Sequence, residues 1–431
     1  MSNLPLYNPR FEHDACGIGL VAYADGRPRP DVMPLALQAL ANLVHRGGVL
    51  ADGKTSDGAG ILCPLPHPFF AAELDREGIA PPPPGSLAVG QLFLPKADPA
   101  LARGIALIES TLARPELGLT RLGWRDVPLN PRVLGPQAEA TRPVIRQVMV
   151  AAAAALDPTA FERRLYLARR IIERDARAAG LDGLYVCSLS GRVIVYKGLL
   201  LGSDLGRFYT DLLNHRFQVG MATFHQRYST NTFPAWQRAQ PFRLLCHNGE
   251  INSIQGNVNW MRAREAHLRS AVWGDAIECL KPVIDERGSD SAMLDNVLEL
   301  LTLSGRGLLH AAAMLIPEAW DMLPADTPQN RRRRDFYAYH AGLMEPWDGP
   351  AALVFCDGRT AGITLDRNGL RPIRFEQTAA GLLIAGSEAG FIELDPATVV
   401  KRGRLGPGQM LALDTATGAV LDDETIKQSL A

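Results

Sequence analysis

The chain contains two kinds of hydrophobic pattern. Short, nearly continuous apolar runs bounded by Gly, Pro or polar clusters are typical of buried strands. They occur at residues 18–24, 61–63, 87–94, 184–189, 193–197, 219–229, 242–249, 351–356, 361–365 and 382–386. Apolar residues at helical spacing predict helices at 32–44, 159–178, 257–268, 291–302 and 422–430.

The order of these elements indicates a fold class. Strands come in blocks separated by helices, without the regular strand–helix–strand alternation of a parallel sheet. This order predicts an α+β fold with stacked sheets covered by helices. Residues 96–180 have a mixed pattern, and we expect them to form an insertion within the domain. The basic run 331–334 is interpreted as a solvated helix face, with phosphate binding as the weaker alternative.

Composition narrows the class of protein. The chain has 431 residues, 47% hydrophobic and 21% charged, with a formal net charge of -1. These values predict a soluble globular protein and give no support for a nucleic-acid partner or a membrane span. The six cysteines form no CxxC pair, which favours a reduced, cytoplasmic protein with no metal site. Residues 1–15 lack the basic and apolar regions of a secretory signal.

Cys16 is the first candidate for chemistry, because it lies beside Gly17 at the start of the first apolar run. A cysteine becomes a nucleophile when a nearby base takes its proton, and an N-terminal α-amine with a pKa of roughly 7.7–8.0 is such a base. Cleavage after Ala15 would create that amine, so we expect residues 1–15 to be a leader. The alternative is that Cys16 is a small buried hydrophobe, as most free cysteines are.

Two glycine-containing motifs follow. His45, Arg46 and Gly47 end the first helix, and Asp57-Gly58-Ala59-Gly60 leads into the next strand. Glycines in such loops let the backbone approach a ligand. For Arg46 and Gly47 a helix C-cap accounts for the sequence equally well.

Polar side chains then gather at the ends of two strands. Arg227, Tyr228, Ser229, Thr230 and Asn231 follow the run 219–224. A guanidinium with neighbouring hydroxyls and an amide suits the carboxylate and polar groups of an α-amino acid. Hydroxyls and amides that only satisfy a turn are the alternative.

A second strand, 242–246, is followed by His247-Asn248-Gly249-Glu250. An Asn amide beside a glycine N–H can supply two donors to one oxygen, which is the requirement for an oxyanion hole. Asn-Gly is also a common turn signal. Asp290, at the start of a predicted helix, could hold a substrate ammonium group, or the segment 289–291 could only cap that helix.

Taken in order, the motifs resemble those of class-II glutamine amidotransferases, a branch of the N-terminal-nucleophile hydrolases with a four-layer α-β-β-α fold. More narrowly, they resemble the amidotransferase domain of glutamate synthase large subunits over essentially the whole chain. The segments are EHDACGIG, ADGKTSDGAGI, YVCSLSGRVIVYKG, QRYSTNTFPAWQRAQPFRLLCHNGEINSIQGN, GSDS, MEPWDGPAALVFCDGR and LDRNGLRPIRF.

The resemblance implies roles by position, with residues 16–431 as the amidotransferase domain. Cys16 would be the nucleophile and its freed amine the base. The Asn248 side chain and the Gly249 N–H would stabilise the oxyanion. Arg227 would bind the carboxylate of glutamine and Asp290 its amine. Substrate contacts are also expected from residues of the loop after Arg227 and from a closing loop: Tyr228, Ser229, Thr230, Asn231 and Arg46.

The resemblance also implies partners. L-glutamine would be hydrolysed to glutamate, and ammonia would pass to a synthase domain that contains FMN and an iron–sulfur cluster and aminates 2-oxoglutarate. This chain has no segment for either cofactor. A glutamine sensor that keeps its leader and does not turn glutamine over is the alternative. Amidotransferases of asparagine or purine-precursor synthesis are disfavoured because no phosphate-binding loop is present.

Overall fold

The computed structural model describes residues 15–229 and 232–431. Its largest sheet has seven strands in the order β14-β12-β13-β1-β8-β2-β7, and every neighbouring pair is antiparallel. The strands are β1 Gly17–Tyr23, β2 Ala59–Pro64, β7 Val193–Gly198, β8 Met221–Gln226, β12 Arg374–Thr378, β13 Leu382–Gly386 and β14 Val399–Arg404.

A five-stranded antiparallel sheet packs on one face of the first, in the order β16-β15-β11-β10-β9. Its strands are β9 Leu245–Gly249, β10 Ala351–Cys356, β11 Thr360–Leu365, β15 Met410–Asp414 and β16 Ala419–Leu421. β9 and β10 contact β1 and β8 across the interface. Two sheets packed face to face explain why β1, β8 and β10 are read as continuous apolar runs rather than alternating ones: both of their faces are covered.

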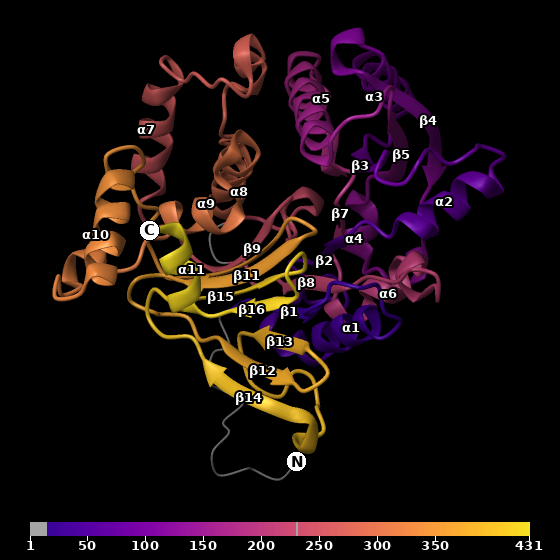
Figure 1. Cartoon of the computed structure of the whole chain (residues 1–431). Coiled ribbons are helices and arrows are strands. Elements are labelled where there is room, and N and C mark those ends of the chain that lie inside the picture. Colours follow the sequence, from indigo (N-terminus) through magenta and orange to yellow (C-terminus); the bar gives the residue numbers. More distant parts are fainter. Residues whose placement is uncertain (1–14, 230–231) are drawn as a thin grey trace.

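Helices cover the outer face of each sheet (Figure 1). α1 Val32–Asn42 packs on β1 and β8. On the other side, α8 Asp290–Leu301 packs on β9, α9 Leu308–Leu315 on β11, and α11 Asp423–Leu430 on β15. The predicted α+β class and four-layer α-β-β-α arrangement are therefore confirmed.

A third sheet lies beside this sandwich, in the order β4-β5-β3-β6. Its strands are β3 Leu87–Leu94, β4 Leu119–Asp126, β5 Val144–Ala152 and β6 Tyr185–Ser190. α3 Asp98–Leu112 and α5 Pro158–Ala178 pack together beside it. Residues 96–180 thus supply two strands and two long helices to this sheet and its cover; that they are an insertion stays a prediction.

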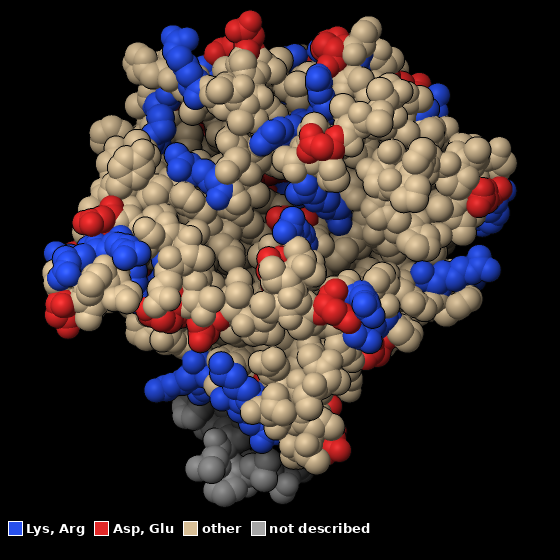
Figure 2. All heavy atoms as spheres, in the orientation of Figure 1, with Lys and Arg blue, Asp and Glu red and all other residues tan. Residues whose placement is uncertain are grey.

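The remaining helices are α2 His67–Arg76, α4 Pro136–Thr141, α6 Leu205–Phe208, α7 Ile254–Glu265 and α10 Pro328–Ala341. Acidic and basic side chains are interspersed over the face in Figure 2, in keeping with the near-zero net charge. The interpretation of 331–334 as a solvated face is wrong for one member. Arg333 is buried and pairs with Glu318 and Glu424, which come from distant segments.

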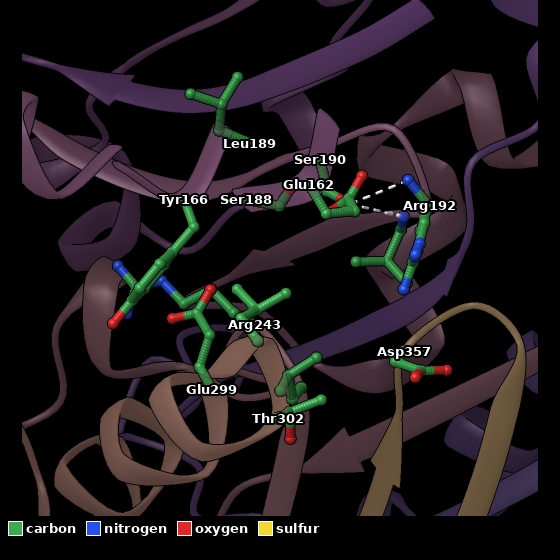
Figure 3. Close-up of a pocket in the computed structure, with 13 residues that line it drawn as sticks. Glu162, Tyr166, Ser188, Leu189, Ser190, Arg192, Arg243, Glu299, Thr302 and Asp357 are labelled. Carbon is green, nitrogen blue, oxygen red and sulfur yellow. Dashed lines mark hydrogen bonds between the residues drawn. The ribbon is translucent and has the colours of Figure 1, made fainter. Parts of the chain in front are cut away.

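A cavity of about 40 Å³ lies between α5, α8 and the β6–β7 turn (Figure 3). The Glu162 carboxylate, on α5, points to that turn and accepts hydrogen bonds from the Ser190 hydroxyl at 2.7 Å and the Gly191 N–H at 2.6 Å. Burial raises the pKa of Glu162 to about 7. None of the residues predicted to bind substrate lines this cavity.

We expect Glu162→Gln to change the pH dependence of stability. A carboxyl whose pKa is higher in the folded than in the unfolded state stabilises the fold while it is protonated, and that contribution is lost as the pH rises towards 7. The free energy of unfolding of Glu162→Gln relative to wild type should therefore increase by about 2 kcal/mol between pH 5 and pH 8. Thermal or denaturant unfolding at both pH values measures this, with exposed Glu393→Gln as the control. Parallel pH profiles for Glu162→Gln and wild type would contradict it.

Candidate active site

The start of β1 and the end of β8 lie side by side. Gly17 on β1 pairs with Gln226 on β8, so the same register places Cys16 opposite Arg227. The Cys16 sulfur accepts a hydrogen bond from the Tyr228 N–H at 3.3 Å, and its thiol is 3.4 Å from the Tyr228 carbonyl oxygen. The structure therefore brings the predicted nucleophile against the segment predicted to bind substrate.

The second sheet brings Asn248 to the same edge. The Cys246 thiol on β9 is 3.6 Å from the Phe224 carbonyl oxygen on β8, and His225 Nε2 is 3.1 Å from the His247 carbonyl oxygen. From the first contact to the second, the residue number increases by one on both strands. Asn248, next on β9, therefore lies at the edge where β8 ends.

The Asn248 side chain is a candidate oxyanion donor. The residue is 2% exposed, and no hydrogen bond joins its side-chain amide to another described residue. An asparagine amide offers N–H donors to an oxygen atom of a ligand. Gly249 follows with a φ of 150°, and a Cβ there would lie 1.7 Å from the Pro350 carbonyl oxygen. Only glycine fits at this position.

Helix α8 fixes the segment after β9. Asp290 accepts a hydrogen bond from the Ile251 N–H at 2.9 Å, and the Ser291 hydroxyl is 2.9 Å from His247 Nδ1. The N-cap is Ser289, whose hydroxyl accepts from the Ala292 N–H. Asp290 is thus the first residue of the helix and remains partly exposed at the site.

Arg227 is the central cation of the site. It is 5% exposed, and its guanidinium donates to the Thr232 hydroxyl at 2.7 Å and to the Asp57 carbonyl oxygen at 3.3 Å. Burial lowers the pKa of Arg227, and the nearby Cys16, Asp57 and Asp290 oppose that shift. Arg227 therefore lies within electrostatic range of both Cys16 and Asp290.

Asp57 is a buried member of the site that sequence reasoning did not select. Its carboxylate accepts a hydrogen bond from the Ser229 N–H at 2.6 Å, and burial raises the pKa of Asp57. The Ser229 hydroxyl donates to the Thr232 carbonyl oxygen. Asp57 is the first residue of the DGAG motif, in which the sequence analysis assigns a role only to the glycines.

The protonation of Cys16 depends on several neighbours. Burial raises the pKa of the thiol, while the backbone hydrogen bond of Tyr228 and the charges of Arg227 and Arg371 lower it. Asp57 raises it further. Arg371 is a second charged neighbour that sequence reasoning missed, although it lies in the LDRNGLRPIRF motif.

Three further residues are predicted to contact substrate: Arg46, Thr230 and Asn231. The Arg46 side chain pairs with Glu388 at 2.6 Å, and its Cβ is 3.3 Å from where a side chain on Gly17 would begin. It is therefore next to the nucleophile but bound to a carboxylate, and its role in a closing loop stays a prediction. Thr230 and Asn231 lie outside the described residues.

No metal or membrane feature accompanies this site. Among the described residues, no group of three or more His, Cys, Asp or Glu side chains is placed to hold a metal ion. In the same part of the chain, no helix has the length and apolar character to span a membrane.

Comparison with known proteins agrees with this geometry. The family described as glutamine amidotransferases class-II matches residues 16–431. This chain belongs to that family. Cys16 is the first residue of the matched region.

Similar curated proteins are all considerably longer. Over 99% of the chain, it is 45% identical to the large chain of an NADPH glutamate synthase from Azospirillum brasilense, of which it covers 28%. It is 45% identical over 97% of its length to a chloroplastic ferredoxin-dependent glutamate synthase from Oryza sativa, of which it covers 26%. Among solved structures, a glutamine phosphoribosylpyrophosphate amidotransferase from B. subtilis is 16% identical with a TM-score of 0.32, covering 53% of this chain and 40% of that one. This structural likeness is too slight to support an inference.

We expect Gly249→Ala to open the end of the β9–β10 ladder. A Cβ cannot approach the Pro350 oxygen to 1.7 Å, so the backbone at the Gly249–Ala351 pair must shift. The free energy of unfolding should fall by about 3 kcal/mol. Denaturant unfolding measures this. The control is Gly256→Ala on α7, where a Cβ meets nothing within 4 Å and helix propensity favours Ala. Equal stability of the two variants would contradict this account.

Proposed function

We propose that this chain hydrolyses L-glutamine to glutamate and ammonia with Cys16 as the nucleophile. One observation carries the proposal. Cys16, beside Tyr228, and the buried residue Asn248 lie at the same edge of the two stacked sheets. Buried Arg227 and partly exposed Asp290 complete the charges that an α-amino acid requires.

Substrate binding follows from these charges. The carboxylate of glutamine would pair with the guanidinium of Arg227. It would compete there with the Thr232 hydroxyl, which now accepts a hydrogen bond from that guanidinium. The α-ammonium group would face Asp290, whose carboxylate is already oriented by the Ile251 N–H. Tyr228 and Ser229 would line the pocket, together with Thr230 and Asn231 of the same loop.

The reaction needs a base and an oxyanion hole. Removal of residues 1–15 would free the Cys16 α-amine, which takes the thiol proton as sulfur attacks the amide carbon. Asn248 and the Gly249 N–H would stabilise the negative oxygen of the tetrahedral intermediate. The intermediate collapses as the C–N bond breaks and the α-ammonium returns its proton to the leaving ammonia. Water, deprotonated by the same amine, then hydrolyses the thioester and releases glutamate.

The whole protein would be a glutamate synthase. The chain covers about a quarter of the length of the relatives described above, whose printed names are glutamate synthases. We propose that ammonia passes to a synthase domain that carries FMN and an iron–sulfur cluster and forms glutamate from 2-oxoglutarate, in the cytoplasm.

A glutamine sensor is the second candidate. Burial raises the pKa of Cys16, and a thiol with a raised pKa is a poor nucleophile while Ala15 is still attached to its nitrogen. A chain that keeps its leader would then bind glutamine through Arg227 and Asp290 without hydrolysing it.

Intact mass and glutaminase activity distinguish the two candidates. We expect preparations whose N-terminus is Cys16 to release ammonia from glutamine, and preparations that retain residues 1–15 to release none. Substitution of the nucleophile by alanine, Cys16→Ala, should leave no ammonia release in any preparation. Hydrolysis at full rate by the chain with its leader would exclude the α-amine as the base.

Asn248→Ala tests the oxyanion assignment. Loss of one donor typically lowers kcat by about a hundred- to a thousandfold, whereas KM for glutamine should change little because Asn248 acts on the transition state. Exposed Asn252→Ala, in the same HNGEIN segment, should retain wild-type kcat and serves as the control. Near-normal kcat in Asn248→Ala would remove Asn248 from the oxyanion hole.

A further inference from the structure

Arg371 is a half-buried cation without a partner. It lies between β11 and β12, and its Nε is buried with no hydrogen-bond partner. Within residues 15–229 and 232–431, its guanidinium forms no hydrogen bond or ion pair. Partly buried arginines normally pair with carboxylates or carbonyl oxygens. An arginine that leaves this capacity unused is available to a negative charge formed elsewhere.

Arg371 and Cys16 precede strands that begin at the same end of the large sheet. Gly386 on β13 pairs with Arg374 on β12 and with Gly19 on β1, so β12 and β1 run parallel on either side of β13. Arg371 lies three residues before Arg374, and Cys16 lies three residues before Gly19. Where the strands pair, the backbones of β12 and β1 are two strand spacings apart, roughly 10 Å, which a long arginine side chain can largely span.

The segment carrying Arg371 is anchored beside the oxyanion strand. Asp366 accepts hydrogen bonds from the Ala351 N–H at 3.0 Å and the Leu370 N–H at 3.2 Å. Ala351 is also the partner of Gly249 in the β9–β10 ladder. Arg371, directly after Leu370, therefore follows a loop that is held to β10, the strand that pairs with β9.

One carboxylate at this end of the sheet is already engaged. Glu388 follows β13, which separates β12 from β1. It pairs with Arg46 at 2.6 Å and with His45 at 3.0 Å. Among the described residues, no ion pair joins a carboxylate to Arg371.

We propose that Arg371 is a positioned cation of the active site that stabilises the Cys16 thiolate and is needed most when glutamine is bound. The inference rests on the proposed function in one respect, the role of Cys16 as nucleophile. Once the carboxylate of glutamine has neutralised Arg227, Arg371 is the cation that still acts on the sulfur.

The electrostatics of the site support this role. The charge of Arg371 lowers the pKa of Cys16, in the same direction as Arg227 and against burial and Asp57. Arg371 also lowers the pKa of His247, so its field reaches the oxyanion strand. Among the described residues, further titratable or charged groups on elements packed around Cys16 are Cys246 and His247 on β9, His225 on β8, His45 and Arg46 before β2, and Glu388 after β13.

Alkylation of Cys16 by iodoacetamide tests the proposal without requiring turnover. The thiolate sulfur displaces iodide from the reagent, and the thiol proton goes to solvent, so the rate at each pH reports the thiolate fraction. Peptide mass spectrometry separates Cys16 from the other five cysteines, including half-buried Cys279. Variants are compared with the same N-terminus, verified by intact mass.

We expect Arg371→Met to shift the alkylation profile of Cys16 to higher pH by about one unit, a tenfold slower reaction near neutral pH. The shift should be larger when saturating L-glutamate neutralises Arg227. Arg371→Lys should keep most of the wild-type profile. Arg367→Met is the matched control, because Arg367 lies in the same segment but is exposed and pairs with Asp348 at 2.7 Å.

Two results would overturn the proposal: an unchanged Cys16 profile in Arg371→Met, or an equal shift in Arg367→Met. If Arg371→Met does not fold, Arg371→Gln against Arg371→Lys gives the same comparison. The outcome is separable from the proposed function. Active protein with an unshifted profile refutes the role of Arg371 alone, whereas a shifted profile in a chain that does not hydrolyse glutamine refutes the glutaminase assignment alone.

Discussion

The contact between β8 and β9 is the constraint on which the site depends. His225 on β8 and the His247 carbonyl oxygen on β9 lie 3.1 Å apart across the two sheets. Because a carbonyl oxygen can only accept, His225 Nε2 must carry the proton, and burial lowers the pKa of His225 to about 3, which keeps the ring neutral. This one hydrogen bond sets the relative position of two strands that belong to different sheets. Any slip between the sheets would separate Cys16 and Arg227 from Asn248.

Helix α8 then holds β9 from its other side. Asp295 accepts hydrogen bonds from the N–H groups of Arg243, Leu244 and Leu245, where β9 begins. Ser291 contacts His247 in the middle of β9, and Asp290 in the first turn of α8 accepts a hydrogen bond from the N–H of Ile251, two residues after β9 ends. A single helix thus holds β9, which carries the proposed oxyanion donor, near both of its ends. Pre-organised donors do not have to reorient during the reaction, which is the physical basis of oxyanion stabilisation.

The sequence was most informative where burial is complete. The eight residues of β3 and the six of β10 are all buried, and the apolar runs predicted both strands at their observed bounds. β14 was missed because it lies at the edge of the large sheet, and its neighbour β12 because most of its residues are at least partly exposed. Their sequences, VVKRGR and RFEQT, carry polar and charged residues. β4 was missed for a similar reason, since most of its residues are at least partly exposed. An edge strand pairs through its backbone, and that pairing leaves no hydrophobic signal.

Site residues could be predicted where they lie next to a recognisable strand or helix. They could not be predicted where their role depends on contacts with residues far away in the sequence. Cys16, Arg227, Asn248 and Asp290 follow or begin recognisable elements, and the structure brings them to one edge. The roles of Asp57 and Arg371 depend on partners that the local sequence does not reveal: Ser229 for Asp57, and for Arg371 the absence of any partner in the described chain. Arg333 is the opposite case, because its carboxylate partners are distant and the local basic run indicated exposure.

The present arrangement of Arg227 indicates how substrate binding and reactivity are coupled. Its guanidinium is bound to Thr232, and Asp57 holds the next part of the same loop through the Ser229 N–H. Under the proposed function, a substrate carboxylate that pairs with Arg227 would compete with the Thr232 hydroxyl for the guanidinium. The loop after β8 also supplies the Tyr228 backbone groups that contact the Cys16 sulfur. In the proposed reaction, glutamine binding at Arg227 would therefore change the hydrogen bonds and the net charge around the Cys16 thiol at the same time.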